Sequence, residues 1–393
     1  MKILVLSFYF RPDLSAGSFR ATALVEALRA QAPDARILVV TSLPNRYSSF
    51  AVDAPEFEDE AGVSVTRIAL PSHQGGMLDQ SKSFLSFAIR AWKRVRNEDI
   101  DVVFATSSRL MTAALGAWIA MRKGALLYLD IRDIFVDTIK DVLPRKAARI
   151  AHPLFALVER MTISRARSVN LVSGGFRQYF EQRYPRQRFT YFTNGIDDEF
   201  LCAAPTAASA IKTGGPLLVV YAGNLGEGQG LHGILPQLAK RTEGKLRFRI
   251  IGDGGRKARL LQGLADAGVT NVEILPPVSR DRLLEHYRAA DVLFMHLNNH
   301  DAFEKVLPSK VFEYGALGKP IWAGVPGFAA DFVRAEVDNA VVFPPCNADA
   351  ALAALAGLVI REQPRPAFIR KFARAEICRA MAADILAAGR GGN

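Results

Sequence analysis

A short run of residues after Lys305 combines residue types that bind phosphate and hydroxyl groups. Pro308 and Ser309 are typical of a helix start, and we expect the Ser309 side chain to cap that helix. The helix N-terminus and the Lys310 ammonium would attract phosphate oxygens. Glu313 follows one turn later, where its carboxylate would accept hydrogen bonds from two ribose hydroxyls. The alternative interpretation is an ordinary capped amphipathic helix.

A glycine-rich loop at 223–230 predicts a second phosphate contact. It follows an apolar strand and precedes a helix, so its backbone N–H groups would face an anion. The loop contains Gly223, Asn224 and Gln229, and it has neither the G-x-G-x-x-G pattern nor a G-K-[ST] ending. The dinucleotide fingerprint and the P-loop are therefore both excluded.

Two polar groups follow predicted strands in the N-terminal half. Gly17 would let the backbone pass close to a ligand, and Ser18 is expected to cap the next helix. Asp130, Arg132 and Asp133 end another apolar strand, where they suit hydroxyl recognition or transition-state electrostatics. The alternatives are a plain turn and a surface ion pair.

Short apolar strands alternate with helical stretches through both halves of the 393 residues. This predicts an α/β protein of two units, each with a parallel sheet covered on both faces. The expected strands lie at 2–8, 35–41, 63–68, 101–105, 126–130, 169–172 and 190–192, and then at 217–222, 247–251, 272–275, 292–295, 320–323 and 340–343. We place the linker at 202–216, which is rich in Ala, Gly, Pro and Thr, and a terminal helical segment at 366–388.

The composition excludes several classes of protein. Three scattered cysteines predict neither a disulfide framework nor a structural zinc site, and they suit a reducing cytoplasm. No apolar run is long enough to predict a membrane span.

The positive charge is uneven, since residues 1–195 hold 27 Lys and Arg against 18 Asp and Glu. That excess indicates an anionic partner: anionic lipid, a pyrophosphate-bearing substrate or nucleic acid.

One basic stretch, 82–96, mixes aromatic residues with cations at helical spacing. Such a stretch is typical of a helix that lies on an anionic membrane, with Phe84, Phe87 and Trp92 as its apolar residues. A helix packed on the sheet with a solvated basic face is the alternative. A second basic cluster consists of Lys140, Arg145, Lys146 and Arg149.

These landmarks resemble glycosyltransferase family 4, in the subgroup whose donor motif reads P-S-K, a hydrophobic residue, then F-E-Y. The loop that begins at Gly223 matches the same subgroup, and V-S-G-G-F at 172–176 and N-G-I-D at 194–197 resemble landmarks of the family ahead of the interdomain linker. The resemblance covers nearly the whole chain. It implies a GT-B fold, with two Rossmann-like doubly wound domains at 1–203 and 204–371 that face a central cleft. A final helix at 372–393 would pack back on the first domain.

The resemblance also implies a reaction. A nucleoside diphosphate-sugar, UDP-linked, would donate an N-acetylated or deoxy-amino sugar to a lipid-linked saccharide acceptor in lipopolysaccharide, O-antigen or capsule assembly. The anomeric configuration would be retained, and neither a metal nor a cofactor is expected. The implied enzyme is cytoplasmic, and it contacts the inner face of an anionic membrane peripherally.

The resemblance assigns site residues as follows. Glu313 would hold the ribose, the base would lie near Pro277 and Val278, and Arg132 and Asp133 would contact the sugar or the acceptor. The catalytic candidates are Asp130, Arg132, Asp133 and Lys310. The donor-binding candidates are Gly17, Gly223, Asn224, Gln229, Pro277, Val278, Lys305, Pro308, Ser309, Lys310 and Glu313.

The chain departs from the wider family at three positions. Lys305 replaces the first glutamate of the E-x7-E pair, while Asn224 and Gln229 replace the Arg and Lys that hold the diphosphate. Lys310, Lys305 and helix-terminal N–H groups would have to compensate. A sugar-nucleotide epimerase of the same fold is one alternative function. A basic nucleic-acid binder is another, although the chain lacks a nucleic-acid-binding motif and we expect no nucleic acid partner.

Overall fold

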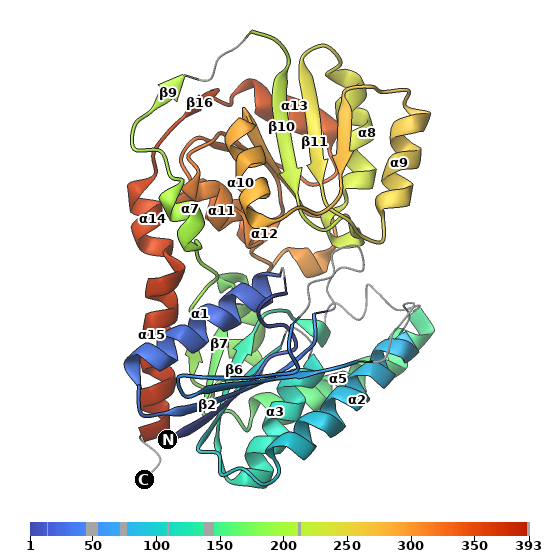
Figure 1. Cartoon of the computed structure of the whole chain (residues 1–393). Coiled ribbons are helices and arrows are strands. Elements are labelled where there is room, and N and C mark those ends of the chain that lie inside the picture. The colour runs from blue at the N-terminus through green and yellow to red at the C-terminus, as the bar shows by residue number, and fades with distance from the viewer. Residues whose placement is uncertain are drawn as a thin grey trace. The chain divides into compact units, whose positions relative to one another are not determined.

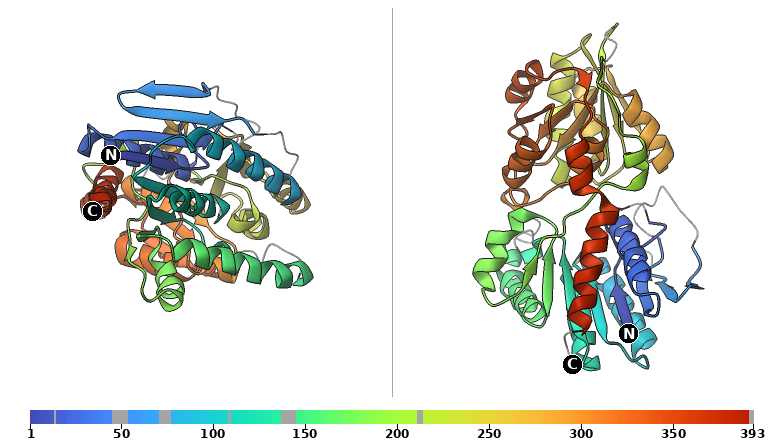
Figure 2. Two further views of the ribbon diagram at one scale, coloured as in Figure 1. Left: turned by 90° about the horizontal axis from the view of Figure 1, so that it is seen from below. Right: turned by 90° about the vertical axis from the view of Figure 1, so that its left-hand side faces the viewer.

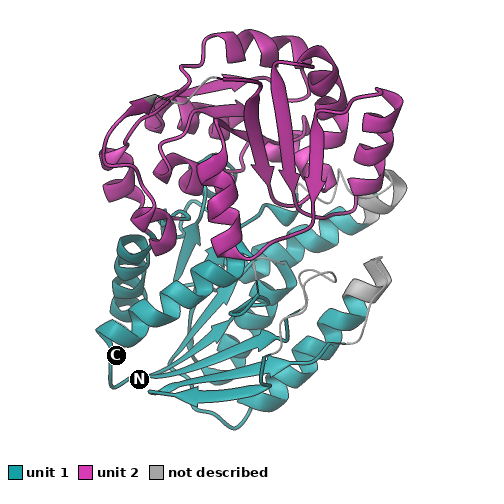
Figure 3. Ribbon diagram, turned by 45° about the horizontal axis from the view of Figure 1, so that its top comes forward, with its two compact units in different colours: residues 1–194, 374–393 teal, residues 195–373 magenta. Residues whose placement is uncertain are grey.

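The structure, a computed structural model, describes residues 1–13, 15–44, 54–70, 77–107, 110–136, 145–210 and 214–390. The chain divides into two compact units (Figure 3). Unit 1 consists of Met1–Asn194 and Arg374–Asn393, and unit 2 consists of Gly195–Ala373. The sequence-based boundaries were 203/204 and 371/372. Each unit is built on its own largely parallel sheet with helices, which confirms the predicted α/β class.

Unit 1 contains an eight-stranded sheet in the order β3-β4-β2-β1-β5-β6-β7-β8. Its strands are β1 (Lys2–Leu6), β2 (Arg36–Ser42), β3 (Phe57–Glu60), β4 (Val63–Ile68), β5 (Val102–Thr106), β6 (Leu126–Ile131), β7 (Ser168–Leu171) and β8 (Phe189–Thr190). Only the pairing of the edge strand β3 with β4 is antiparallel among these. Strand β3 was not predicted, because its acidic, largely exposed sequence has no apolar alternation.

Helices cover both faces of this sheet (Figures 1 and 2). One face packs against α1 (Ala16–Gln31) and α15 (Arg374–Arg390), and the other against α2 (Met77–Val95), α3 (Leu110–Lys123) and α5 (Arg145–Ile163). The short helices are η1 (Gly174–Phe176) and α6 (Arg177–Arg183). Burial on both faces explains why the central strands β1, β2, β5 and β6 are mostly apolar runs rather than alternating sequences.

Unit 2 contains six parallel strands in the order β12-β11-β10-β13-β14-β15. They are β10 (Leu217–Ala222), β11 (Leu246–Ile251), β12 (Val272–Leu275), β13 (Val292–His296), β14 (Ile321–Gly324) and β15 (Ala340–Phe343). The short strands β9 (Ser209–Ala210) and β16 (Arg361–Glu362) form a separate antiparallel pair. The helices are α7 (Asp198–Cys202), η2 (Glu227–Gln229), α8 (Leu231–Arg241), α9 (Lys257–Asp266), α10 (Arg280–Ala289), η3 (Asp301–Phe303), α11 (Lys310–Ala316), α12 (Gly327–Glu336), α13 (Ala348–Ala356) and α14 (Pro366–Phe372).

Both sheets share a doubly wound strand order, which reverses beside the strand of each sheet that comes first in the sequence. The reversal lies between β1 and β5 in unit 1 and between β10 and β13 in unit 2. Ligands of such sheets bind outside the carboxyl ends of the strands at this switch point. The glycine-rich loop after β10 therefore begins where a ligand is expected.

The terminal helical segment predicted at 366–388 is two helices, not one. Ala373 separates α14 from α15 because its ψ of 123° is extended rather than helical. Helix α14 belongs to unit 2 and α15 to unit 1. Buried side chains of α15 join the core that α1 forms on the sheet of unit 1; they include Cys378, Met381 and Ile385.

A buried polar network connects the elements of unit 1. The Arg20 guanidinium of α1 donates to both carboxylate oxygens of Asp130 on β6, at 2.9 and 3.0 Å, and also to the carbonyl of Phe192. Asn170 of β7 donates to the same carboxylate at 2.8 Å. Burial alone would raise the pKa of Asp130, but the Arg20 charge holds that pKa below its ordinary value. The pair thus remains ionised inside the core.

We expect Asp130→Asn to lower the free energy of unfolding of unit 1 by about 3–5 kcal/mol, because Arg20 would keep a buried charge without its counterion. Urea unfolding can be followed through Trp92 and Trp118 in a Trp322→Phe background, since both remaining tryptophans lie in unit 1.

The matched control is Glu98→Gln, which removes a partly exposed partner of Lys2 and Arg94. This change should cost less than about 1 kcal/mol. Adding Arg20→Met to Asp130→Asn should restore much of the loss. Equal costs for the Asp130 and Glu98 variants would contradict a structural role for the buried pair.

Candidate functional site

The glycine-rich loop and helix α11 meet at the carboxyl end of β10. The Lys310 ammonium lies so close to the Cα of Gly223 that a Cβ at this position would collide with Nζ and Cε of Lys310. Gly223 also has a φ of +145°, which side chains other than glycine rarely adopt. Nζ lies 5.3 Å from the ring centroid of Tyr221. The structure therefore brings together two residues that the sequence assigned to separate phosphate contacts.

The electrostatic state of Lys310 suits an anionic ligand. Burial lowers the pKa of Lys310, and the Glu313 carboxylate opposes that shift. A partly desolvated cation interacts more strongly with an incoming anion than a solvated cation does. Binding of a phosphate would also stabilise the protonated form of Lys310.

Glu313 lies one turn along α11 from Lys310 and is partly exposed. The buried Tyr287 hydroxyl of α10 is 3.5 Å from its carboxylate. Arg280, also on α10, bonds to Asp197 at 2.8 Å. Burial lowers the pKa of Arg280, but the negative charges of Asp197 and Glu313 outweigh this effect and raise the pKa above its ordinary value. Residues of α10, which the sequence analysis did not single out, thus support the carboxylate.

The predicted cap of α11 is wrong. Ser309 has helical dihedral angles (φ −61°, ψ −25°), and its side chain makes no capping hydrogen bond. A capping residue needs extended dihedral angles so that its oxygen can reach the first free N–H groups. The chain instead turns at Pro308, whose carbonyl accepts from Val311 N at 3.2 Å.

The other end of α11 is held by a residue that the sequence analysis missed. The buried Arg365 guanidinium donates to the carbonyls of Gly315 and Lys319, at 3.2 and 2.9 Å. Because the last carbonyls of a helix have no partner within the helix, a cation there stabilises it. Arg365 thus fixes the helix that carries Lys310 and Glu313.

The remaining donor-binding candidates of unit 2 lie in the glycine-rich loop, before α11 and after β12. Asn224 and Gln229 bond to each other, with Asn224 Nδ2 donating to Gln229 Oε1 at 3.0 Å. Lys305 is partly exposed between η3 and α11. Pro277 and Val278 follow the edge strand β12, two strands from β10 in the sheet.

In unit 1, Gly17 lies in the first turn of α1. A Cβ on Gly17 would meet no atom closer than 3.7 Å, so local packing within unit 1 does not require a glycine there. Ser15, not Ser18, caps this helix, since Ser15 Oγ accepts from Ser18 N at 3.2 Å. Ser18 is already inside the helix and its side chain is buried.

The three candidates after β6 differ in accessibility. Asp130 is 0% exposed and its carboxylate bonds to core residues, so we assign it to positioning rather than to substrate contact. Arg132 lies 3.9 Å from Asp130 and keeps about a tenth of its side chain exposed. Burial lowers the pKa of Arg132 to about 10, and the guanidinium stays charged at neutral pH. Asp133 is exposed.

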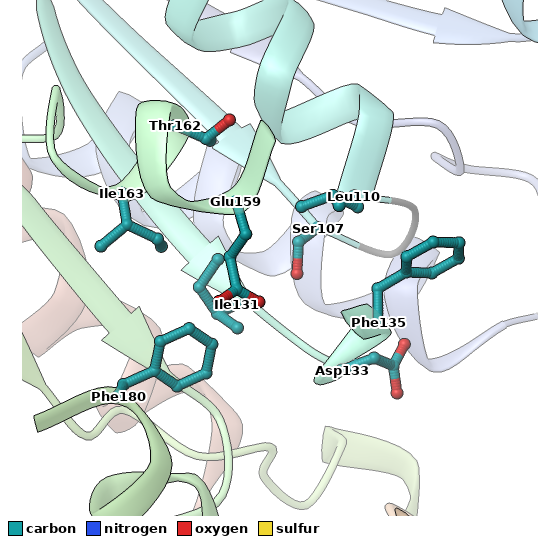
Figure 4. Close-up of a pocket in the computed structure, with 9 residues that line it drawn as sticks. All are labelled: Ser107, Leu110, Ile131, Asp133, Phe135, Glu159, Thr162, Ile163 and Phe180. Atoms are coloured by element: carbon teal, nitrogen blue, oxygen red, sulfur yellow. The ribbon is translucent and has the colours of Figure 1, made fainter. Parts of the chain in front are cut away.

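A small cavity lies beside Asp133, between the end of β6 and α5 (Figure 4). The Ser107 hydroxyl and the Glu159 carboxylate both point into it, and the Tyr179 hydroxyl donates to Glu159 at 3.1 Å. Its volume of about 10 Å³ is room for one water molecule. The cavity is too small for a sugar, and we assign Glu159 to the packing of α5.

Helices α2, α3 and α5 combine exposed apolar side chains with cations. The sequence predicted that Phe87 is one of the apolar residues that contact the membrane. Phe87 is instead fully buried against Phe8, with ring centroids 5.2 Å apart. Trp92 packs edge-on against Trp118 at 4.7 Å. The exposed apolar residues of this layer are Leu85, Ile89, Met111, Trp118, Met121, Leu154, Leu157 and Met161.

Among the described side chains of this helix layer, the charges at the surface have one sign. Among the side chains that the structure describes on these helices, Glu159 is the only carboxylate, and it is buried. Of the second basic cluster, Arg149 is exposed, Lys140 lies outside the described residues, and the side chains of Arg145 and Lys146 are not described. The exposed cations are Lys82, Arg90, Lys93, Arg122, Arg149 and Arg160.

In the described parts of the chain, no three His, Cys, Asp or Glu side chains are grouped so that they could hold a metal ion. No helix within those parts is long and apolar enough to cross a membrane.

Two family models match the chain, one for each half. Residues 17–195 match the glycosyl transferase 4-like domain, and residues 207–375 match glycosyl transferases group 1. A colanic acid biosynthesis glycosyl transferase of Escherichia coli (strain K12), WcaI, is 25% identical over 343 residues, which cover 81% of this chain and 82% of that protein.

Solved structures of glycosyltransferases share the fold. The Anabaena protein Alr3699/HepE in complex with UDP has a TM-score of 0.60 at 15% identity, and the match covers 99% of this chain and 98% of that protein's chain. WaaG, which is involved in lipopolysaccharide biosynthesis, has a TM-score of 0.65 at 14% identity, with the same coverage. A UDP-forming trehalose-phosphate synthase of Burkholderia xenovorans has a TM-score of 0.67 at 14% identity, and the match covers 98% of this chain and 99% of that protein's chain.

We expect Lys310→Met to weaken binding of UDP by about tenfold to a hundredfold, because a charged hydrogen bond contributes about 1.5–3 kcal/mol. The affinity for uridine should change less than about threefold, because uridine has no phosphate with which Lys310 could form this hydrogen bond. Methionine keeps most of the packing against Tyr221 and Gly223, and titration calorimetry measures both affinities.

Lys240→Met is the matched control, since Lys240 lies in the last turn of α8, far from its N-terminal end. It should leave both affinities unchanged. An equal loss of UDP and uridine binding by the Lys310 variant would show that Lys310 does not contact phosphate.

Proposed function

The chain belongs to the family-4 glycosyltransferases of GT-B fold, and we propose that it transfers a sugar from a UDP-sugar to a lipid-linked saccharide. The sugar is N-acetylated or deoxy-amino, and the anomeric configuration is retained. The product enters lipopolysaccharide, O-antigen or capsule assembly. The colanic acid and lipopolysaccharide relatives support this class of product.

The observation that carries the proposal is the contact between Lys310 and Gly223. It places one desolvated cation at the carboxyl end of β10, where a doubly wound sheet binds its ligand. Glu313, one turn along the same helix, is spaced to accept from ribose hydroxyls while Lys310 holds the diphosphate. One short helix thus offers one contact for the ribose and one for the diphosphate.

The proposed mechanism uses no metal. As the bond between the sugar and the diphosphate breaks, negative charge grows on the leaving oxygen. A preorganised cation stabilises that charge without rearranging during the reaction, and Lys310 supplies it. Arg132 and Asp133 of unit 1 contact the sugar or the acceptor hydroxyl in this scheme. The acceptor attacks from the face that the diphosphate leaves, which retains the configuration.

The helix layer α2, α3 and α5 supplies the membrane contact in this proposal. Its exposed Leu85, Leu154 and Leu157 would enter the interface while Lys93 and Arg160 approach lipid phosphates. Anionic lipid attracts each such cation by about 1 kcal/mol. A peripheral enzyme would in this way meet an acceptor whose lipid stays in the bilayer.

The direct test is transfer from a panel of UDP-, dTDP- and GDP-sugars to a lipid-linked saccharide in the presence of EDTA. We expect transfer from UDP-linked N-acetylated or deoxy-amino sugars at the same rate with and without EDTA. Product NMR should show the anomeric configuration of the donor.

Three outcomes would contradict the proposal. A strict requirement for Mg²⁺ or Mn²⁺ would exclude the metal-independent mechanism. Inversion at the anomeric carbon would exclude front-face attack. Release of free sugar without any acceptor would favour the epimerase alternative.

The membrane contact predicts that the wild-type protein sediments with anionic vesicles at low salt and detaches at high salt, because salt screens surface charges within a Debye length. We expect Lys93→Glu with Arg96→Glu to abolish sedimentation. UDP affinity should not change, because both cations lie in unit 1.

Lys245→Glu with Arg247→Glu gives an equal change of charge on exposed residues of unit 2. This control variant should still sediment. If it detaches as readily as the first variant, net charge rather than the α2 surface causes the binding. If the wild-type protein ignores anionic vesicles, a soluble acceptor replaces the lipid-linked one.

A further inference from the structure

His296 at the end of β13 and Asn298 just after it bond to three successive carbonyls of the glycine-rich loop. Asn298 Nδ2 donates to Glu227 O at 2.9 Å, and the backbone N–H of Asn298 donates to Gly228 O at 2.8 Å. His296 Nδ1 lies 2.7 Å from Gln229 O. Since β13 and β10 flank the switch point of unit 2, these bonds cross the place where the ligand is expected to bind.

The bonding of His296 fixes its protonation state. The Gln229 carbonyl can only accept, so Nδ1 carries the proton. The backbone N–H of Cys346 donates to Nε2 at 3.0 Å, so Nε2 carries a lone pair. The ring is 1% exposed, and burial lowers the pKa of His296 to about 4. His296 is therefore a neutral bridge between two backbone segments.

The surrounding residues make room for this bridge. A Cβ on Gly324 of the neighbouring strand β14 would collide with the His296 ring. Gly230 has a φ of +59°, and a Cβ there would lie 3.0 Å from Asn298 Cγ. Glycines on both sides thus allow the ring and the Asn298 side chain to approach the loop closely.

We propose that His296, with Asn298 beside it, is a positioning residue that holds the glycine-rich loop in its donor-binding conformation. The loop carries amides at Asn224 and Gln229 instead of cations, so its backbone dipoles must act on the phosphates. Fixed dipoles stabilise charge better than mobile ones, and a glycine-rich loop loses much entropy when it is ordered. The inference rests on the proposed donor site.

Three substitutions of His296 separate positioning from space filling. An Asn amide nitrogen can take the place of Nδ1 and donate to Gln229 O. A Gln amide oxygen can take the place of Nε2 and accept from Cys346. Phe keeps the ring volume beside Phe294 and Phe343 but can form neither bond.

We expect His296→Asn to bind UDP within about threefold of wild type, while His296→Gln and His296→Phe lose about tenfold, as for one hydrogen bond. Hydrogen exchange should accelerate at the amides of Gly230 and Asn298 in the Gln and Phe variants, and not in the Asn variant. Space filling predicts the reverse order, since Phe preserves volume and Asn leaves a cavity.

Thr242→Val is the control for a lost buried hydrogen bond in unit 2, because Thr242 bonds to Leu238 O at the far end of α8. It should lower stability without changing UDP affinity or loop exchange. Equal UDP affinity of the Phe and Asn variants, or unchanged exchange in the Phe variant, would overturn the inference. If wild-type protein binds no UDP, the proposed donor fails, and the exchange data alone decide whether His296 holds the loop.

Discussion

The contact of the Lys310 ammonium with the Cα of Gly223 is the constraint on which the site in unit 2 depends. It requires a glycine at the end of β10, both for the backbone angle and for the space. It also requires α11 to begin at a fixed place, so other residues must hold this helix in position. The helix buries Val311, Phe312 and Tyr314 in the core, while Arg365 holds its last carbonyls. The core thus decides where the cation lies.

Much of this arrangement could be predicted from local sequence. Strands β4, β10, β12 and β15 were predicted to the residue, because each is a short stretch rich in apolar and β-branched residues. Gly223, Lys310 and Glu313 stand in recognisable strand–loop–helix patterns. Predictions failed where packing decides the outcome. Whether Ser309 caps a helix depends on its own dihedral angles, which are helical here, and whether Phe87 faces solvent depends on which side of α2 meets the sheet. Arg20 and Asp130 are 110 residues apart, so no local pattern reveals their bond.

The two units use different interactions to hold the elements near their switch points. Each has a doubly wound sheet, and each must hold loops in register near its switch point. Unit 1 uses the ion pair of Arg20 with Asp130, which fixes α1 to β6 but keeps two charges in the core. Unit 2 uses the neutral imidazole of His296 between two backbone segments. Neutral groups cost less to bury than ions, and they leave the field of a nearby cation unopposed.

This difference matters for the phosphate site. With an amide pair at Asn224 and Gln229 and a neutral His296 behind them, these groups add no net charge to the loop. Attraction of a diphosphate then depends on Lys310 and on backbone dipoles. The energy of a charge with a dipole falls more steeply with distance than that of two charges, so a dipole-based loop tolerates less displacement than a cationic one. A loop that has exchanged cations for amides therefore needs a rigid support, and the bonds from His296 and Asn298 to three successive carbonyls provide it.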